Sequence, residues 1–516
     1  MTQVLDATTT RLDEKISELA QRYRPLSVQI LREAIRIPAD HIGEDPKCGL
    51  SGHELPRLEY LRRTIADIGA VDKPEDVWFD DFGNLCWVVQ DRNDGVPADE
   101  KTVVMFDGHT DTVNALRPRW HEAIGGGIDP YLGWIDGKKI DHEFLSRELG
   151  YLPPDGEWNY LVWGRGAADL LAGVVSQIIA TKILRECREQ GALRGVIVRA
   201  FGTISEEDND GGSPMYLVRE AYPNASKDRV PDAVIITEGT GCAQLGAVGI
   251  YRGQRGRMQI EVEVTGKSCH GSMPWEGRNP LEYGAAMIVE AADLYRNSVG
   301  FAKDEFLGGG TRTASWATLA TPSDCAVPER FTFRFDRRLT AGEDPDRALA
   351  DVRSMSTVAK AIADGLKVDV RTPLYNDPTW RGYRLDNAQI YPGWVTPEEH
   401  PAIPAAVEAY KRVSSPLIKP GGKRGEMRRE PRVARWIFST DGVGFPTRTY
   451  TPPQSKHWIR DGAFTYPAML GIGPGIEQNT HKIGECMDSR EFPPVVAFLA
   501  RFPTAYRAKL ATGASR

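Results

Sequence analysis

Three apolar segments with the length and composition of buried strands are each followed by acidic or imidazole side chains, and this repeated pattern constrains the fold most. The segments are 103–106, 196–201 and 233–237, all rich in Val or Ile. A helical period, clearest over 170–184, separates them. Strands that alternate with helices predict an α/β sheet that is at least partly parallel. Because ligands collect at the carboxyl ends of strands in such sheets, a site is expected at that edge.

The first strand leads into His109, and Asp111 follows two residues later. Side chains alternate between the faces of an extended backbone, so residues two apart point the same way. A carboxylate in that position can orient an imidazole that binds a metal ion. The alternative is an ordinary hydrogen-bonded pair of side chains, so the remaining ligands must come from elsewhere in the chain.

Further carboxylates follow at similar places. Asp169 lies between a glycine turn and a helix, where it could instead be a helix N-cap. Glu206 and Glu207 follow the second strand. Side chains of adjacent residues at a strand end point in different directions, so one can be a metal ligand and the other a base for a water. The alternative is an acidic loop exposed to solvent. With Glu238 after the third strand and with His481, the chain offers the mixed nitrogen and oxygen donors expected for zinc, enough for two ions if Asp169 bridges them.

Length and charge narrow the class of protein. A chain of 516 residues can form two or more domains, and a net charge of −7 argues against a general nucleic-acid binder. The segment 1–20 has no apolar core, and no apolar run is long enough to span a membrane, so neither a signal peptide nor an anchor is expected. Seven scattered cysteines suit reduced thiols in a cytoplasm. The basic stretch 419–435 is interpreted as a solvated loop.

The pattern of apolar and polar residues changes after residue 251. Segment 258–264 alternates apolar and polar residues, as in a half-exposed antiparallel strand. Further strands are predicted at 315–319, 331–339 and 367–370, with helices over 281–295 and 345–363. These elements predict an inserted α+β domain with a four-stranded antiparallel sheet and two helices. The expected divisions are 1–250 and 373–516 for a catalytic domain with a mixed, largely parallel sheet between helices, and 251–372 for the inserted domain. Other helices are expected over 12–37, 55–68, 403–413 and 493–510.

Taken together, the motifs resemble the co-catalytic dizinc family of succinyl-diaminopimelate desuccinylase, acetylornithine deacetylase, aminoacylase and glutamate carboxypeptidase. The matching stretches span nearly the whole chain: 108–112, 164–169, Glu206-Glu207, Glu238, 266–270, 336–338 and Thr480-His481. Segments 323–328 and 336–340 look most like a subgroup called selenium-metabolism-linked hydrolases.

The resemblance implies a division of roles at the metal centre. One Zn²⁺ would be held by His109, Asp169 and Glu238, and a second by Asp169, Glu207 and His481, with Co²⁺ or Mn²⁺ as possible substitutes. Asp111 would orient His109 without touching a metal. Glu206 would be the general base that takes a proton from water and returns it to the leaving amine.

The resemblance also implies that the inserted domain is a lid that joins a homodimer. Arg338 would bind a substrate carboxylate, although a salt bridge within its strand is the alternative. His270 would reach the partner subunit's active site and polarise the scissile carbonyl. Cys325 stands where many members have a substrate-contacting Asn, and a thiol cannot replace the hydrogen bonds of an amide. Gly473, in the turn after the strand 468–472, is also expected at the substrate site.

The sequence therefore predicts a cytoplasmic metallohydrolase that cleaves a peptide or N-acyl amide bond next to a carboxylate-bearing residue of a small substrate, with no nucleic-acid or membrane partner. An alternative is an amidohydrolase of a non-peptidic amide, ureido or carbamoyl compound that uses the same centre. A catalytically silent dimer that binds a metal or a metabolite is a third possibility, disfavoured because every expected ligand and base position is filled. No Gly-x-Ser-x-Gly motif supports a serine hydrolase. Insertions at 141–162 and 419–435 differ from the family pattern, and such loops often decide which substrate fits.

Overall fold

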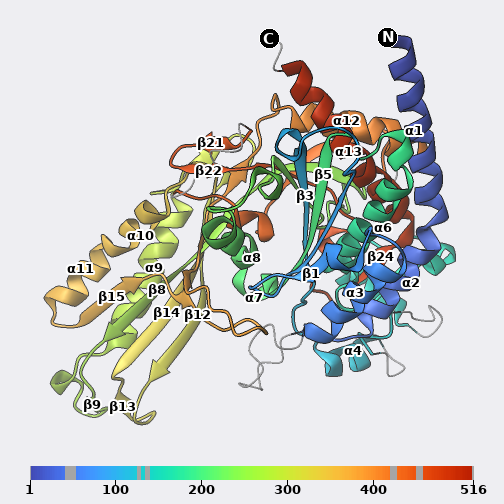
Figure 1. The fold of residues 1–516 in the computed structure, drawn as a ribbon. Helices are drawn as coiled ribbons and strands as arrows, with labels where there is room; N and C mark the ends of the chain where they lie inside the picture. The colour runs from blue at the N-terminus through green and yellow to red at the C-terminus, as the bar shows by residue number, and fades with distance from the viewer. Residues whose placement is uncertain are drawn as a thin grey trace.

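The computed structural model of the chain describes residues 2–40, 54–124, 129–133, 140–418, 427–448 and 457–513. They form an α/β body that carries both termini, from which a smaller α+β unit projects (Figure 1). This confirms the predicted fold class. The boundaries given above for the domains stay a prediction. Residues 419–426 of the predicted basic loop 419–435 lie outside the described residues.

A nine-stranded mixed sheet forms the centre of the body. Its strands run in the order β1 (Val77–Phe79), β2 (Leu85–Gln90), β5 (Val196–Thr203), β3 (Thr102–His109), β6 (Ala233–Ile236), β23 (Ala468–Gly471), β7 (Gly249–Gln254) and β19 (Trp394–Val395), and β20 (Arg432–Trp436) also pairs with β7. The four central strands β5, β3, β6 and β23 are parallel, whereas β1, β2 and β19 pair antiparallel at the edges. The carboxyl ends of β5, β3 and β6 therefore meet at one edge, as the sequence predicted.

Apolar helices bury the central strands. α6 (Ala172–Glu186) and α13 (Phe492–Gly513) pack against each other and against β3 and β5. The helical segment Ala167–Glu186 is long and apolar enough to cross a membrane by composition, but 94% of its most apolar 18-residue window is buried inside the protein. Its burial identifies it as a core helix of the body.

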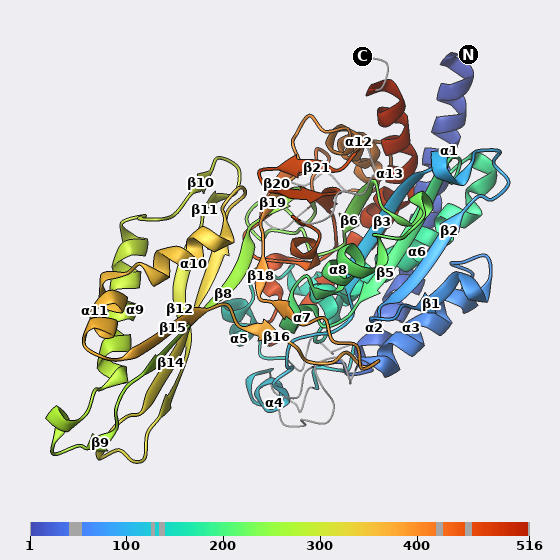
Figure 2. The same cartoon turned by 60° about the vertical axis from the view of Figure 1, so that its left-hand side comes forward.

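The projecting unit, here called the lid, is built on β8 (Gly256–Thr265). Strands β12 (Thr311–Ala320), β14 (Arg330–Leu339) and β15 (Lys367–Arg371) complete the predicted antiparallel sheet, and the short β18 (Ile390–Tyr391) adds a fifth strand. One face of this sheet packs on α9 (Pro280–Arg296), α10 (Pro345–Arg353) and α11 (Ser356–Ala363) through a separate apolar core. Figure 2 shows the lid reaching away from the body, with β9 (Cys269–His270) at its far end.

Two predicted helices are each divided. The helix expected over 12–37 is α1 (Thr2–Arg22) and α2 (Arg24–Ile35), because Pro25 cannot donate the backbone hydrogen bond that would join them. The helix expected over 345–363 breaks at Met355, whose backbone is extended. There Glu290 of α9 accepts hydrogen bonds from the backbone N–H groups of Ser356 and Thr357 and so caps α11.

The segment 114–160, which includes most of the insertion predicted at 141–162, contains regular helices where the structure describes it. It contains α4 (Arg117–Ile124) and α5 (His142–Glu148), which pack around a small core with Trp120, Trp158 and Trp163. The six cysteines among the described residues are all free.

Candidate metal centre and substrate cavity

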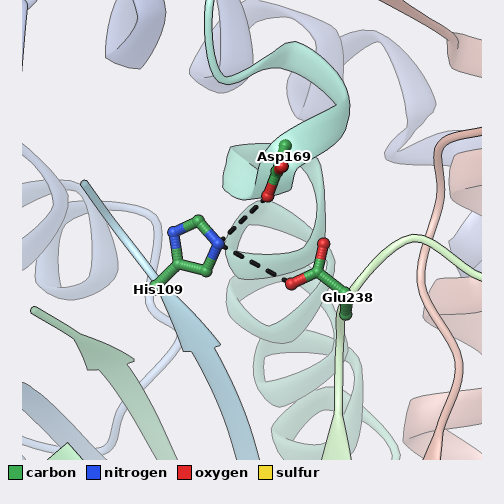
Figure 3. A group of neighbouring side chains, drawn as sticks. All are labelled: His109, Asp169 and Glu238. Carbon is green, nitrogen blue, oxygen red and sulfur yellow. Dashed lines mark hydrogen bonds and ion pairs between the residues drawn. The ribbon is translucent and has the colours of Figure 1, made fainter. Parts of the chain in front are cut away.

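The first group of converging side chains comes from three separate elements. His109 is the last residue of β3, Asp169 lies in the turn that precedes α6, and Glu238 follows β6 by two residues. His109 Nε2 is 3.1 Å from Asp169 Oδ1 and 3.6 Å from Glu238 Oε2 (Figure 3). All three residues are buried. The structure thus brings together the three residues that the sequence assigned to one ion.

The second group shares Asp169 with the first. His481 Nε2 is 3.0 Å from Asp169 Oδ2 and 3.1 Å from Glu207 Oε2. Each oxygen of the Asp169 carboxylate therefore faces a different imidazole. The His481 side chain is 53% exposed, so this group opens toward solvent while the first lies deeper.

The donor set fits divalent cations. Within each group one ligand atom per residue lies within 4.8 Å of the others, and imidazole with carboxylate is a combination that zinc accepts. Among the described residues no Lys or Arg forms an ion pair with Asp169, Glu206, Glu207 or Glu238. Burial, together with the Asp169 charge, raises the pKa of Glu238 well above its usual value, because buried carboxylates close together oppose each other's ionisation. The ligand roles stay a prediction.

The pKa values of the two imidazoles are also raised, which favours their charged forms. Burial alone would lower the pKa of His109, but hydrogen bonds with Asp111 and Asp169 raise it well above its usual value. The same competition raises the pKa of His481 to about 11, with Asp169 and Glu207 as its partners. Both rings thus lie in a strongly negative environment, which a metal ion would neutralise in place of protons.

Glu206 and Glu207 do not lie at a strand end, so the argument from an extended backbone was wrong. They begin a single helical turn, α7 (Glu206–Asn209), after Ser205, whose φ of 58° is left-handed. The backbone N–H groups of both residues donate to the Asp111 carboxylate at 3.1 Å. Asp111 therefore fixes the turn that presents the predicted base and the predicted ligand.

Asp111 also lies beside His109. His109 Nδ1 is 3.1 Å from the Asp111 carbonyl oxygen and 3.5 Å from its Oδ1. These contacts leave Nε2 directed at Asp169 and Glu238, as an orienting role for Asp111 requires. Glu206 Oε2 lies 3.7 Å from the same Nε2, so the predicted base borders the deeper group.

Arg165 and Glu485 were given no role from the sequence, yet they connect the turn that contains Asp169 with the loop that contains His481. The Glu485 carboxylate accepts from Arg165 Nη1 at 2.6 Å and from the backbone N–H groups of Ala168 and Asp169 at 3.0 and 3.2 Å. Arg165 Nη2 donates to the His481 carbonyl oxygen at 3.4 Å. Both side chains are almost fully buried. This pair therefore holds the backbone at the predicted ligands Asp169 and His481. Arg165 and Glu485 are too far apart in sequence for a local pattern to pair them.

A cavity of about 450 Å³ opens beside both groups. Its lining includes residues of the centre and residues of the lid and neighbouring loops: Asp169, Glu206, Glu207, Asp210, Glu238, Arg257, Arg338, Ile437, Phe438, Ser439, Glu477, Gln478, Thr480 and His481. Arg338 thus lies where the sequence placed a substrate-binding Arg. Its guanidinium forms a bidentate pair with Asp336 and donates to Ser439 at 3.1 Å, so the strand salt bridge considered as an alternative is also present.

Three other predicted residues lie away from this cavity. Gly473 packs directly behind Glu238, where a Cβ would lie 2.0 Å from the Thr237 carbonyl oxygen, and its carbonyl accepts from Thr240. His270 lies in β9 at the far end of the lid, where it pairs with Ala326 of β13 (Ala326–Val327), and Cys325 lies in the turn just before β13 (Figures 1 and 2). Both are exposed. Within one chain they do not approach the centre, and their predicted roles depend on a second subunit.

Comparison with known proteins supports the family resemblance. Residues 252–362, which lie in the lid, match the model of the peptidase dimerisation domain of the M20 group. The chain is 28% identical to an uncharacterized Escherichia coli (strain K12) protein, YgeY, over 96% of this chain and 97% of that one. It is 33% identical to a probable succinyl-diaminopimelate desuccinylase of Staphylococcus aureus (strain MSSA476) over 26% of this chain and 28% of that protein.

The fold has solved counterparts. An M20 family metallo-carboxypeptidase from Sulfolobus solfataricus superposes with a TM-score of 0.60 and 14% identity, covering 93% of this chain and 99% of the other. At that identity the likeness concerns the fold.

Proposed function

We infer that this chain, which belongs to the M20 family of metallohydrolases acting on amide bonds, cleaves a peptide or N-acyl amide bond next to a carboxylate-bearing residue. The observation that carries the proposal is the pair of ligand groups that share Asp169 beside a cavity containing Glu206 and Arg338. A cation-binding centre, a base and a carboxylate-binding group then face one space. Members of the family use a divalent metal, typically zinc; two Zn²⁺ ions are proposed here.

Each ligand group would hold one ion, with Asp169 common to both. When bound, such ions polarise a carbonyl and lower the pKa of a water. Glu206 accepts a proton from the attacking water, whose oxygen bonds to the amide carbon. Glu206 then gives the proton to the amine nitrogen as the C–N bond breaks. Asp111 keeps Glu206 in place through the backbone of α7.

Arg338 supplies the proposed recognition of the substrate carboxylate. Its guanidinium is held by Asp336 and Ser439, so little side-chain freedom would be lost on binding. A substrate carboxylate would replace or share the Asp336 contacts in the same plane.

A homodimer joined through the lid is proposed as the working form, with His270, and Cys325 beside it, acting in the partner's cavity. The exposed position of both at the lid's far end supports this proposal. A cytoplasmic location is proposed from the reduced cysteines.

The test is a substrate panel with purified, zinc-loaded protein. Dipeptides and N-acetyl, N-succinyl and N-carbamoyl amino acids would be compared with amides that lack a carboxylate. We expect turnover only of carboxylate-bearing substrates, and loss of about 10²-fold or more of that activity in Glu206→Gln with metal content unchanged. Retained activity in Glu206→Gln would exclude the assigned base. Efficient turnover of carboxylate-free amides, with Arg338→Ala harmless, would favour the non-peptidic alternative.

A further inference from the structure

Glu477 is a cavity carboxylate that the proposed hydrolysis does not use. It opens the short helical turn 477–479 in the loop that leads to His481, and its backbone N–H donates to the Gly241 carbonyl oxygen at 2.9 Å. The side chain is half-buried and lines the same cavity as both ligand groups. It therefore faces the substrate space from the wall formed by the body, whereas Arg257 and Arg338 face it from strands of the lid.

The contacts of Glu477 leave one oxygen available. Its Oε1 accepts a hydrogen bond from the Tyr251 hydroxyl, and Tyr251 in turn accepts from Arg432 Nη1 at 2.9 Å. Among the described residues, none donates to Oε2, and no Lys, Arg or His lies within ion-pair distance of the carboxylate. Arg432 uses its second terminal nitrogen on the Thr240 carbonyl oxygen. Glu477 is thus held at a fixed orientation, and Arg432 favours its charge from behind Tyr251 without contacting the carboxylate.

The other carboxylates of the cavity differ in this respect. Glu206, Glu207, Glu238 and Asp169 surround the proposed metal ions, and Asp210 is paired with Arg257 and accepts from Ser439 at 2.6 Å. Burial raises the pKa of Glu477 to about 6, so its charged form lacks full solvation near neutral pH. A partly buried carboxylate with no cation in direct contact is costly, and a cationic group of a ligand at Oε2 would relieve that cost.

We propose that Glu477 binds an ammonium group of the substrate through its free Oε2. The proposal rests on the proposed function and narrows it: the preferred substrate is zwitterionic, with a free amino group on the acyl side of the scissile bond and a carboxylate, bound by Arg338, on the amine side. This describes an unblocked dipeptide or similar aminoacyl amide. An N-acylated amino acid lacks the ammonium, and an N-succinyl amino acid would place a second carboxylate against Glu477.

The test measures binding separately from turnover. In a zinc-loaded Glu206→Gln background, calorimetry would give dissociation constants for glycyl-leucine and N-acetylglycyl-leucine, which differ at the amino group. We expect the free-amine peptide to bind more tightly. Adding Glu477→Gln, which preserves side-chain shape and the acceptor for Tyr251, should weaken that peptide roughly 10- to 100-fold, the range for loss of a charge-assisted hydrogen bond. The N-acetyl peptide should change by less than about 3-fold.

A second variant distinguishes the effect of the Glu477 charge from that of its hydrogen bond with Tyr251. Tyr251→Phe removes the hydrogen bond to Glu477 but keeps its charge, so the preference for the free amine should persist. Equal weakening of both peptides by Glu477→Gln, no effect of it, or no binding of the free-amine peptide would overturn the proposal. The proposed function is tested separately, by hydrolysis of the substrate panel with the unsubstituted enzyme. The ratio of the two peptide affinities requires no hydrolysis, so the two proposals can fail independently.

Discussion

The variant Asp111→Asn tests whether Asp111 positions its neighbours or binds a metal ion itself. The Asp111 carboxylate accepts two backbone N–H groups, those of Glu206 and Glu207, each at 3.1 Å. An amide of the same shape has one acceptor oxygen, so one N–H would lose its partner and face an NH₂ group. Loss of one charged hydrogen bond costs about 1.5–3 kcal/mol. If that cost appears as misplacement of Glu206, kcat should fall about 10- to 150-fold.

The measurements are steady-state kinetics on a substrate from the panel and zinc content after dialysis. Asp111→Asn should retain the metal content of the unaltered protein at saturating zinc while kcat falls. Asp208→Asn is the matched control, because Asp208 lies next to Glu207 and accepts no hydrogen bond from the described residues; its kcat should change by less than about 3-fold. Loss of one zinc ion per chain in Asp111→Asn would refute the reasoning, since Asp111 would then be a ligand. Unchanged kcat would refute the positioning of Glu206.

Three other predictions concern residues outside the proposed ligand set. Glu485→Gln breaks the buried pair with Arg165 and should lower the free energy of unfolding by about 3–5 kcal/mol in urea titrations; the double variant Arg165→Gln/Glu485→Gln should recover part of this loss, and full additivity would show that the pair is not coupled. Burial lowers the pKa of His400 to about 4, and its Nδ1 accepts from the Ala402 N–H at 3.2 Å. Because the unfolded state then binds more protons between pH 6.5 and 4, the free energy of unfolding should fall by up to about 3 kcal/mol as the pH is lowered through that window. His400→Gln should flatten this pH dependence, and an unchanged slope would contradict the assignment. His270→Ala and Glu206→Gln should each be inactive as homodimers, but mixing their subunits should restore activity, because one site of the mixed dimer then has both residues intact; no restoration would place His270 in its own subunit's site.

The five predicted ligands converge in the structure, and the sequence anticipated part of this grouping because His109 and Glu238 follow apolar strands and Asp169 follows a glycine turn. His109 and Glu238 lie where parallel strands end, so sheet geometry alone brings them to one edge. Asp169 and His481 come from turns, and the family resemblance was needed to place them. The strand-end argument for Glu206 and Glu207 was wrong because α7 depends on Asp111, a contact made across the edge of the sheet.

Residues that act through distant partners could not be found in this way. Glu485 meets Arg165 across 320 residues, and Glu477 meets Tyr251 across 226. The division of the helix over 345–363 likewise depends on Glu290 from another helix. The break at Tyr23, by contrast, follows from Pro25; the proline was visible in the sequence, and the prediction of one undivided helix over 12–37 overlooked it.

The central claim is that two divalent ions lie on either side of Asp169. Anomalous diffraction at the zinc absorption edge from zinc-loaded crystals tests it most directly. The account predicts two anomalous peaks per chain, each about 2 Å from a different Asp169 oxygen, one with His109 and Glu238 and the other with Glu207 and His481. A single peak, or a peak with Asp111 among its ligands, would contradict it.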